Sequence, residues 1–236
     1  MPLPPLYPVL DYSCFAAKPD PLRAMLDFAE QLLAAGVTIL QYRDKSSAPR
    51  TFLANARELR RATLGKATFI VNDRADLALA CDADGVHLGQ DDLSPAAARK
   101  IFDAAERERR RVPHPFATKT QSSTELSSER VGYDKIIGFS THSLSQVREA
   151  DSFPVDYIAV GPVFATASKV NPDPVIGLEG VRAARAATRK PLVAIGGITR
   201  VNCREVRDSG ADSVAVISDL LESPVKAVEA FLRVLG

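Results

Sequence analysis

The chain has 236 residues, 46% of them hydrophobic, and its 30 basic and 29 acidic side chains leave a formal net charge of +1. Such a balance argues against a protein that binds nucleic acid or an anionic membrane through the electrostatic attraction of its net charge. No apolar run approaches the roughly 18 residues that span a bilayer, and the first residues lack the regions of a secretory signal. Cys14, Cys81 and Cys203 are odd in number and scattered, which disfavours a disulfide framework or a zinc site. We therefore expect a cytoplasmic protein.

Short apolar, β-branched runs alternate with segments of helical period along the chain. The expected strands are residues 6–12, 38–43, 68–72, 85–88, 135–139, 157–160, 192–195 and 213–217. The expected helices are residues 21–35, 50–64, 74–81, 94–110, 143–151, 179–189, 201–209 and 224–235. This alternation predicts an α/β fold, a (β/α)8 TIM barrel that forms a single domain over residues 1–236. A doubly wound open sheet is the alternative, which the lack of G-x-G-x-x-G after the first strand disfavours.

Residues 107–133 do not fit the alternating pattern. A basic run, Arg109–Arg111, precedes a segment rich in proline and small polar residues. We expect an exposed insertion, placed on the face away from the chemistry because it leads from a helix to the next strand. Since Glu106 and Glu108 interleave with the arginines, a solvated helix end is favoured over nucleic-acid binding.

The second expected strand ends in residues that suit a polyanion. Gln41, Arg43 and Lys45 alternate along it and so project to one side, toward the mouth of a barrel. Two cations and an amide that converge there could clamp a diphosphate. The alternative is an edge of surface ion pairs in which Asp44 neutralises one neighbour, and these residues alone do not decide between the two.

Two carboxylates follow the next two expected strands. Asp73 and Asp92 would meet at the same mouth, where Mg2+ is usually held by one or two carboxylates together with substrate phosphates. The alternative is that both cap helices, although Ser94, followed by Pro95, is the better cap at the second position. His87, on the expected strand 85–88, is interpreted as a hydrogen-bonded barrel histidine rather than an acid–base group or a metal ligand.

Further anion-binding residues follow the later strands. Ser140 ends the fifth strand, and the long loop after the sixth, typical of a lid, contains Thr166, Ser168 and Lys169. Glycine pairs such as Gly196–Gly197 let backbone N–H groups approach phosphate in the loops after strands seven and eight. Two anion sites and a metal site in one mouth predict two phosphorylated substrates, one of them a diphosphate.

The order and spacing of seven motifs together strongly resemble the thiamine phosphate synthase family. The motifs are Gln-Tyr-Arg-Asp-Lys (41–45), Asn-Asp (72–73), Gly-Val-His-Leu-Gly-Gln-Asp-Asp (85–92), Gly-Phe-Ser-Thr-His (138–142), Gly-Pro-Val-Phe-Ala-Thr-Ala-Ser-Lys (161–169), Ile-Gly-Gly-Ile (195–198) and Val-Ile-Ser (216–218). The resemblance implies a transferase that joins 4-amino-5-hydroxymethyl-2-methylpyrimidine diphosphate to 4-methyl-5-(2-hydroxyethyl)thiazole phosphate. It implies a dissociative reaction, in which diphosphate leaves before the thiazole nitrogen captures a pyrimidine-methyl cation.

The resemblance also implies roles for individual residues. The pyrimidine diphosphate contacts would be Gln41, Arg43, Lys45, Asn72, Ser140 and Lys169, of which Arg43, Lys45, Ser140 and Lys169 act in catalysis. The thiazole phosphate contacts would be Thr166, Ser168, Gly197, Ile217 and Ser218. One Mg2+ per subunit would be held by Asp73 and Asp92. Ser168 stands where threonine is commoner in the family, but a hydroxyl is retained.

Three other functions compete with this one. A thiazole tautomerase-like barrel would use His142, a non-catalytic regulator would only bind phosphate, and a phosphosugar isomerase would need an acid–base pair that the sequence does not offer. The carboxylate pair and the cationic strand end favour the synthase. The expected partners are small phosphorylated molecules, with no nucleic acid and no membrane, and the sequence leaves open whether the chain forms a homo-oligomer.

Overall fold

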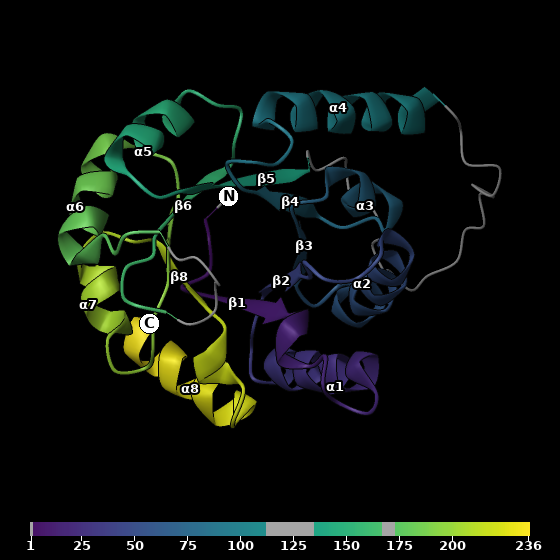
Figure 1. Ribbon diagram of the computed structural model, residues 1–236, viewed down its shortest axis with the longest axis horizontal. Coiled ribbons are helices and arrows are strands. Elements are labelled where there is room, and N and C mark those ends of the chain that lie inside the picture. The colour runs from purple at the N-terminus through teal and green to yellow at the C-terminus, as the bar shows by residue number, and fades with distance from the viewer. Residues whose placement is uncertain (1, 112–134, 167–172) are drawn as a thin grey trace, which may run out of the picture.

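In the computed structural model, which describes residues 2–111, 135–166 and 173–236, eight parallel strands close into a barrel in chain order (Figure 1). The strands are β1 (Leu6–Asp11), β2 (Ile39–Arg43), β3 (Thr68–Asn72), β4 (Gly85–Leu88), β5 (Ile136–Thr141), β6 (Tyr157–Val160), β7 (Leu192–Ile195) and β8 (Ser213–Val216). The surrounding helices are α1 (Pro21–Ala34), α2 (Pro49–Thr63), α3 (Ala75–Ala80), α4 (Pro95–Arg111), α5 (Leu144–Asp151), α6 (Gly177–Ala187), α7 (Cys203–Asp208) and α8 (Pro224–Leu235). The predicted (β/α)8 fold is confirmed.

Two hydrophobic cores hold the barrel together. The larger core lies between the outer face of the strands and the ring of helices, with side chains such as Leu40, Phe69 and Phe231. The smaller core fills the barrel itself, where Tyr7, Val9 and their counterparts from other strands pack. Because successive strand residues point to opposite faces, each strand contributes alternately to the two cores. The inward-facing set is the one that continues up to the barrel mouth.

Two helices begin at a serine that is followed by a proline, Ser94–Pro95 for α4 and Ser223–Pro224 for α8. Ser94 Oγ accepts a hydrogen bond from the Ala97 amide at 3.3 Å, as expected of the residue that caps α4. Ser223 occupies the N-cap position of α8, but its side chain makes no capping hydrogen bond. There the proline at the first helical position, with its fixed φ, is the remaining start signal.

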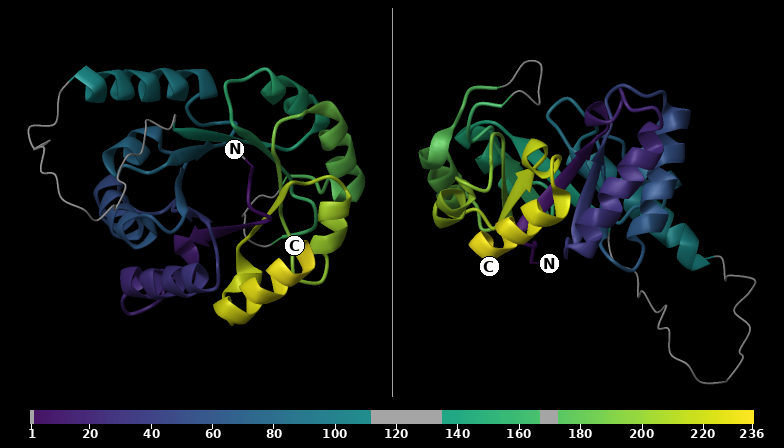
Figure 2. Two further views of the ribbon diagram at one scale, coloured as in Figure 1. Left: turned by 180° about the vertical axis from the view of Figure 1, so that it is seen from behind. Right: turned by 90° about the horizontal axis from the view of Figure 1, so that it is seen from below.

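The predicted insertion begins later than the sequence indicates. Residues 107–111, assigned to the insertion, are the last residues of α4, and 112–133 lie outside the described residues. Ion pairs explain this continuation of the helix: Arg110 contacts Glu106 at 2.9 Å within the helix, and Arg109 contacts Asp82 at 3.3 Å. The basic run is thus a solvated, ion-paired helix end, as predicted. Figure 2 shows this end of α4 on the same side of the barrel as the chain termini.

The remaining boundaries differ from prediction by a few residues. The largest difference among the strands is β5, which continues through Ser140 to Thr141 because its backbone pairs with β6 up to Val160. Across the residues that the structure describes, no helix combines the length and the apolar character that a membrane span requires.

We expect Gly138→Ala to lower the free energy of unfolding by about 1–3 kcal/mol, because overpacking a closed core displaces its neighbours. A Cβ at this position of β5 would overlap the phenol ring of Tyr157 on β6, a side chain that is 1% exposed. Urea denaturation of the variant checks the expectation. An unchanged unfolding free energy would show that the Tyr157 ring can move without cost.

Candidate active site

A cavity of about 470 Å³ opens at the carboxyl ends of the strands, and residues from all eight strands line it. In (β/α)8 barrels this end carries the active site. Every predicted site residue that the structure describes lines the cavity: Gln41, Arg43, Lys45, Asn72, Asp73, Asp92, Ser140, Thr166, Gly197, Ile217 and Ser218. The two remaining predicted residues, Ser168 and Lys169, lie outside the described residues.

The two cations of the predicted clamp each contact a carboxylate. Arg43 forms an ion pair with Asp11, which ends β1 and is 3% exposed. Lys45 Nζ lies 3.0 Å from a carboxylate oxygen of Asp73. Asp44 instead accepts hydrogen bonds from the amides of the loop that follows it and from the Tyr42 hydroxyl. The alternative in which Asp44 neutralises a neighbouring cation is therefore wrong, and the cations stay at the cavity.

The predicted carboxylate pair meets at the mouth. Burial, and then contact with the Asp73 carboxylate, raise the pKa of the Asp92 carboxyl above its usual range. Asp92 also accepts a hydrogen bond from the Gly89 amide at 2.7 Å. Asp73 adopts a left-handed backbone conformation with φ 63°, which is rare for a residue with a side chain and is often found at functional sites.

The carboxylate pair suits a magnesium ion that takes only some of its ligands from the protein, rather than a metal enclosed by protein ligands alone. Within the described ranges no group of three or more histidine, cysteine, aspartate or glutamate side chains could hold a metal. Two carboxylates that repel each other electrostatically favour a cation between them. Mg2+ commonly completes its coordination with water and substrate phosphate. Asp73 does not act as the cap of α3, whose N-cap is Arg74.

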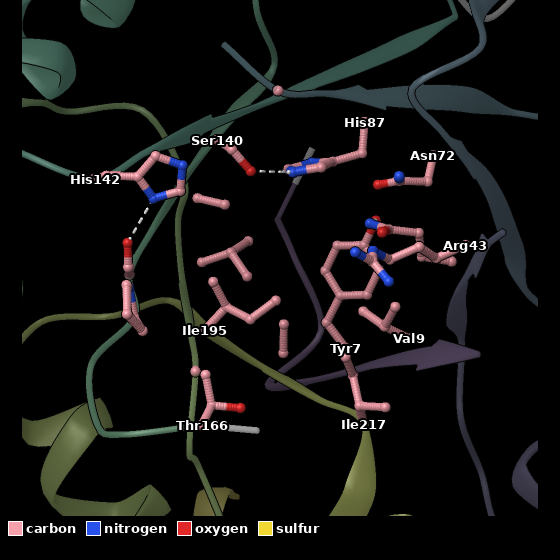
Figure 3. A pocket seen from close by; sticks show the side chains of 18 of the residues that line it. Tyr7, Val9, Arg43, Asn72, His87, Ser140, His142, Thr166, Ile195 and Ile217 are labelled. Atoms are coloured by element: carbon pink, nitrogen blue, oxygen red, sulfur yellow. Dashed lines mark hydrogen bonds between the residues drawn. The ribbon is translucent and has the colours of Figure 1, made fainter. Parts of the chain in front are cut away.

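A chain of hydrogen bonds, which we call the floor chain, crosses the bottom of the cavity. Gln41 Nε2 lies 3.1 Å from the Tyr7 hydroxyl, which lies 2.8 Å from the Tyr157 hydroxyl. The Tyr157 hydroxyl lies 2.9 Å from His87 Nδ1, and His87 Nε2 lies 2.8 Å from Ser140 Oγ, the bond drawn in Figure 3. The interpretation of His87 as a hydrogen-bonded barrel histidine is confirmed.

The middle of the floor chain stays uncharged around neutral pH. Burial lowers the pKa of His87 to about 4, although the nearby Asp73 carboxylate acts in the opposite direction. Burial likewise raises the pKa of Tyr7 to about 12 and that of Tyr157 well above its usual value. His87 is thus a neutral imidazole between two hydroxyl groups.

The depressed pKa of His87 predicts a loss of stability in mild acid. Between the ordinary histidine pKa of about 6.5 and the folded value of about 4, the unfolded chain binds a proton that the folded chain does not. The unfolding free energy should therefore fall by up to about 1.4 kcal/mol per pH unit from this group as pH drops through that window. Urea denaturation of wild type and His87→Gln between pH 4 and 7 measures the difference. Parallel pH profiles would contradict the expectation.

The opposite side of the cavity carries hydroxyl groups and glycine backbone. Thr166 lies across the pocket from His87 and Asn72, with apolar side chains such as Ile195 between them (Figure 3). Gly197 has φ 63°, and a Cβ there would lie 2.5 Å from the carbonyl oxygen of Ala165. Only glycine lets the backbone after β7 approach the loop after β6 this closely.

His142, the residue that a tautomerase-like function would use, also lines the cavity. Its Nδ1 lies 2.7 Å from the carbonyl oxygen of Gly161 and 3.5 Å from a carboxylate oxygen of Asp173. The ring is held at the rim of the pocket beside the loop after β6 (Figure 3).

Sequence reasoning missed several polar residues in and around this site, among them Tyr7 and Tyr157 in the cavity and Asp11, the partner of Arg43. Asp11 and Tyr7 share the inward face of β1 with Val9, so the period of two could have placed both. Tyr157 begins β6 opposite Gly138 of β5, and a glycine that faces a large aromatic side chain in register is a signal visible only once the pairing is known.

Comparisons with known proteins agree on one family. The family model described as thiamine monophosphate synthase matches residues 7–106 and 118–220. A thiamine-phosphate synthase from Koribacter versatilis is 48% identical over 99% of this chain and 96% of its own length. One from Chloroflexus aurantiacus is 38% identical over 87% of this chain and 82% of its own length. A solved thiamine phosphate pyrophosphorylase from Pyrococcus furiosus is 32% identical, with a TM-score of 0.75 over 98% of this chain and 95% of that one.

Proposed function

Because the chain belongs to the thiamine monophosphate synthase family, a family of transferases, we propose that its cavity joins 4-amino-5-hydroxymethyl-2-methylpyrimidine diphosphate to 4-methyl-5-(2-hydroxyethyl)thiazole phosphate. The products are thiamine phosphate and diphosphate. The bond between the pyrimidine methylene carbon and the diphosphate oxygen breaks, and a bond from that carbon to the thiazole nitrogen forms.

The observation that carries the proposal is that two sides of the cavity differ in the groups that line them. Arg43 and Lys45 lie with two carboxylates on one side, which suits a diphosphate accompanied by a metal ion. Thr166, Gly197 and Ser218 offer hydroxyl and backbone donors elsewhere around the rim, which suits a monophosphate. Apolar side chains between the two sides suit the two heterocycles.

The residues present match a reaction that needs no activated nucleophile. The charge that grows on the departing diphosphate is the main demand, and fixed cations stabilise such charge most strongly in a partly dry site. We assign this task to Arg43, Lys45 and Lys169, with Gln41, Asn72 and Ser140 orienting the pyrimidine. Thr166, Ser168, Gly197, Ile217 and Ser218 would hold the thiazole phosphate.

Asp73 and Asp92 would hold one Mg2+, which when bound neutralises part of the diphosphate charge. This assignment is supported by the raised pKa of the Asp92 carboxyl beside Asp73, since both groups gain from a shared cation. The surrounding pocket is compatible with small phosphorylated molecules as the protein's partners, and we place the protein in the cytoplasm.

We expect purified protein to form thiamine phosphate and diphosphate in equal amounts from the two substrates with Mg2+, and to form neither when one substrate is left out. Chromatography of thiamine phosphate and a coupled diphosphate assay measure the two products. Conversion of thiazole phosphate alone, without diphosphate, would point to a tautomerase-like function with His142. Binding of both substrates without turnover would point to a phosphate-binding regulator.

A further inference from the structure

The floor chain contains a fixed number of protons. Its four hydrogen bonds each need one proton. Tyr7 and Tyr157 are buried phenols and supply one each, and His87, whose two ring nitrogens both face hydroxyl groups, supplies one as a neutral imidazole. The fourth proton must come from one end of the floor chain, either the Gln41 amide or the Ser140 hydroxyl. If both ends donated, one bond would hold two protons; if neither did, one bond would hold none.

The floor chain therefore has two polarities. In the first, Gln41 donates to Tyr7, each following group donates toward Ser140, and the Ser140 hydroxyl keeps its own proton for the cavity. In the second, Ser140 donates to His87, every bond is reversed, and the Gln41 carbonyl accepts from Tyr7. The structure has Gln41 Nε2, the donor atom, facing Tyr7, which is the first polarity.

We propose that the floor chain transmits hydrogen-bond polarity between Gln41 and Ser140, with Tyr7, Tyr157 and His87 as positioning residues that select the ligand. The inference rests on the proposed function for the identity of that ligand. In the first polarity the cavity is offered the Gln41 carbonyl oxygen as acceptor and the Ser140 hydroxyl as donor. This pair suits a ligand with an amino group at Gln41 and an acceptor at Ser140, as an aminopyrimidine diphosphate can provide.

Selectivity follows from the coupling of the two ends. An analogue with an oxo group in place of the amino group would require the Gln41 amide to turn its nitrogen toward the cavity. That turn reverses all four bonds and withdraws the donor at Ser140, so the analogue loses a contact at the far end as well. Buried polar groups left without a partner are costly, so the protein gains strong discrimination from residues that do not touch the amino group.

The tautomer of His87 in the ligand-free protein reports the polarity directly. The chain has three histidines, so 15N NMR of imidazole-labelled protein can assign each ring nitrogen. The first polarity predicts that His87 carries its proton on Nε2 and accepts on Nδ1. The opposite tautomer in wild type would overturn the proposal.

Tyr7→Phe tests the transmission, because the Tyr7 hydroxyl bonds to Gln41 and Tyr157 but is two links away from the imidazole. Without it, the orientation of the Gln41 amide no longer determines the direction in which Tyr157 donates, so we expect the single His87 tautomer to become a mixture. Gln41→Met makes the same test from the Gln41 end of the floor chain. A single unchanged tautomer in both variants would overturn the proposal.

Tyr42→Phe is the matched control, since it removes a buried hydroxyl from the neighbouring core, where that group bonds to Asp44. We expect the His87 tautomer to stay unchanged there. A mixture in this variant as well would assign the effect to general loosening of the barrel and would overturn the proposal.

Ligand selection separates this inference from the proposed function. Calorimetric titration compares 4-aminopyrimidine diphosphate with its 4-oxo analogue, and we expect the preference of wild type for the amino compound to fall about tenfold in Tyr7→Phe. An unchanged preference would overturn the transmission. A wild-type protein that binds neither compound would contradict the proposed function. In that case the His87 tautomer, measured without ligand, would still show whether the floor chain transmits polarity.

Discussion

Removal of divalent metal with EDTA is expected to lower the rate of diphosphate release by about a thousandfold, and added Mg2+ is expected to restore it. The physical reason lies in the site itself, where Asp73 and Asp92 bring two carboxylates together at the place assigned to a diphosphate. Without the metal ion, the negative charge of these two groups, which Lys45 offsets only in part, repels the substrate. Diphosphate release measured with both substrates at saturating Mg2+, then with EDTA, checks the expectation.

Variants locate that effect in the carboxylate pair. Asp73→Asn and Asp92→Asn should each raise the Mg2+ concentration needed for half-maximal rate, because each removes one charged ligand. Asp76→Asn is the matched control, since Asp76 lies outside the cavity and pairs with Arg74 at 2.6 Å. A rate that persists undiminished in EDTA, or a control variant as defective as the others, would remove the metal role from Asp73 and Asp92.

Arg43→Ala is expected to lower kcat/KM by roughly 30- to 1,000-fold, which corresponds to about 2–4 kcal/mol of transition-state stabilisation. Arg43 is the cation that a buried carboxylate holds at the cavity, so its loss removes a preorganised charge and leaves Asp11 as an uncompensated one. Steady-state kinetics with both substrates measure the change. We expect a loss of the same size for Lys169→Ala, which is predicted from the sequence alone.

Arg61→Ala controls for the loss of a surface arginine, because Arg61 pairs with Glu58 on the exposed side of α2. Thermal denaturation shows whether the Arg43 variant stays folded, and Asp11→Asn/Arg43→Ala removes the buried charge together with its partner. Unchanged kcat/KM in Arg43→Ala and Lys169→Ala would exclude both side chains from the reaction.

Much of this fold was predictable because the barrel repeats one local pattern. Each strand is a short apolar run and several helices have a start or stop signal, so element order follows from neighbouring residues alone. The predicted ends of strands and helices were wrong where tertiary contacts override the local preference of the sequence. The Ser-Thr end of β5 is typical of a loop, yet pairing with β6 keeps it in the sheet. The charged end of α4 is extended by the contact of Arg109 with Asp82, which lies 27 residues earlier in the chain, between α3 and β4.

The site was predictable to the extent that its residues follow strand ends in recognisable motifs. Asp73 and Lys45 could be placed at one mouth without knowing that they touch, because the parallel strands end together. The floor chain could not be predicted in this way. Tyr7 and Tyr157 are 150 residues apart, and their contact depends on how the whole barrel is closed rather than on either strand.

The ion pair between Asp11 and Arg43 determines when the conformational entropy of this arginine is lost. The Asp11 side chain is 4% exposed and that of Arg43 is 22% exposed, so the guanidinium is ordered as the barrel folds. Long charged side chains otherwise lose about 1.5–2 kcal/mol of rotamer freedom when they become fixed. Because folding has already fixed Arg43, the diphosphate proposed to bind there would meet an ordered side chain, and more of the contact energy would remain as affinity.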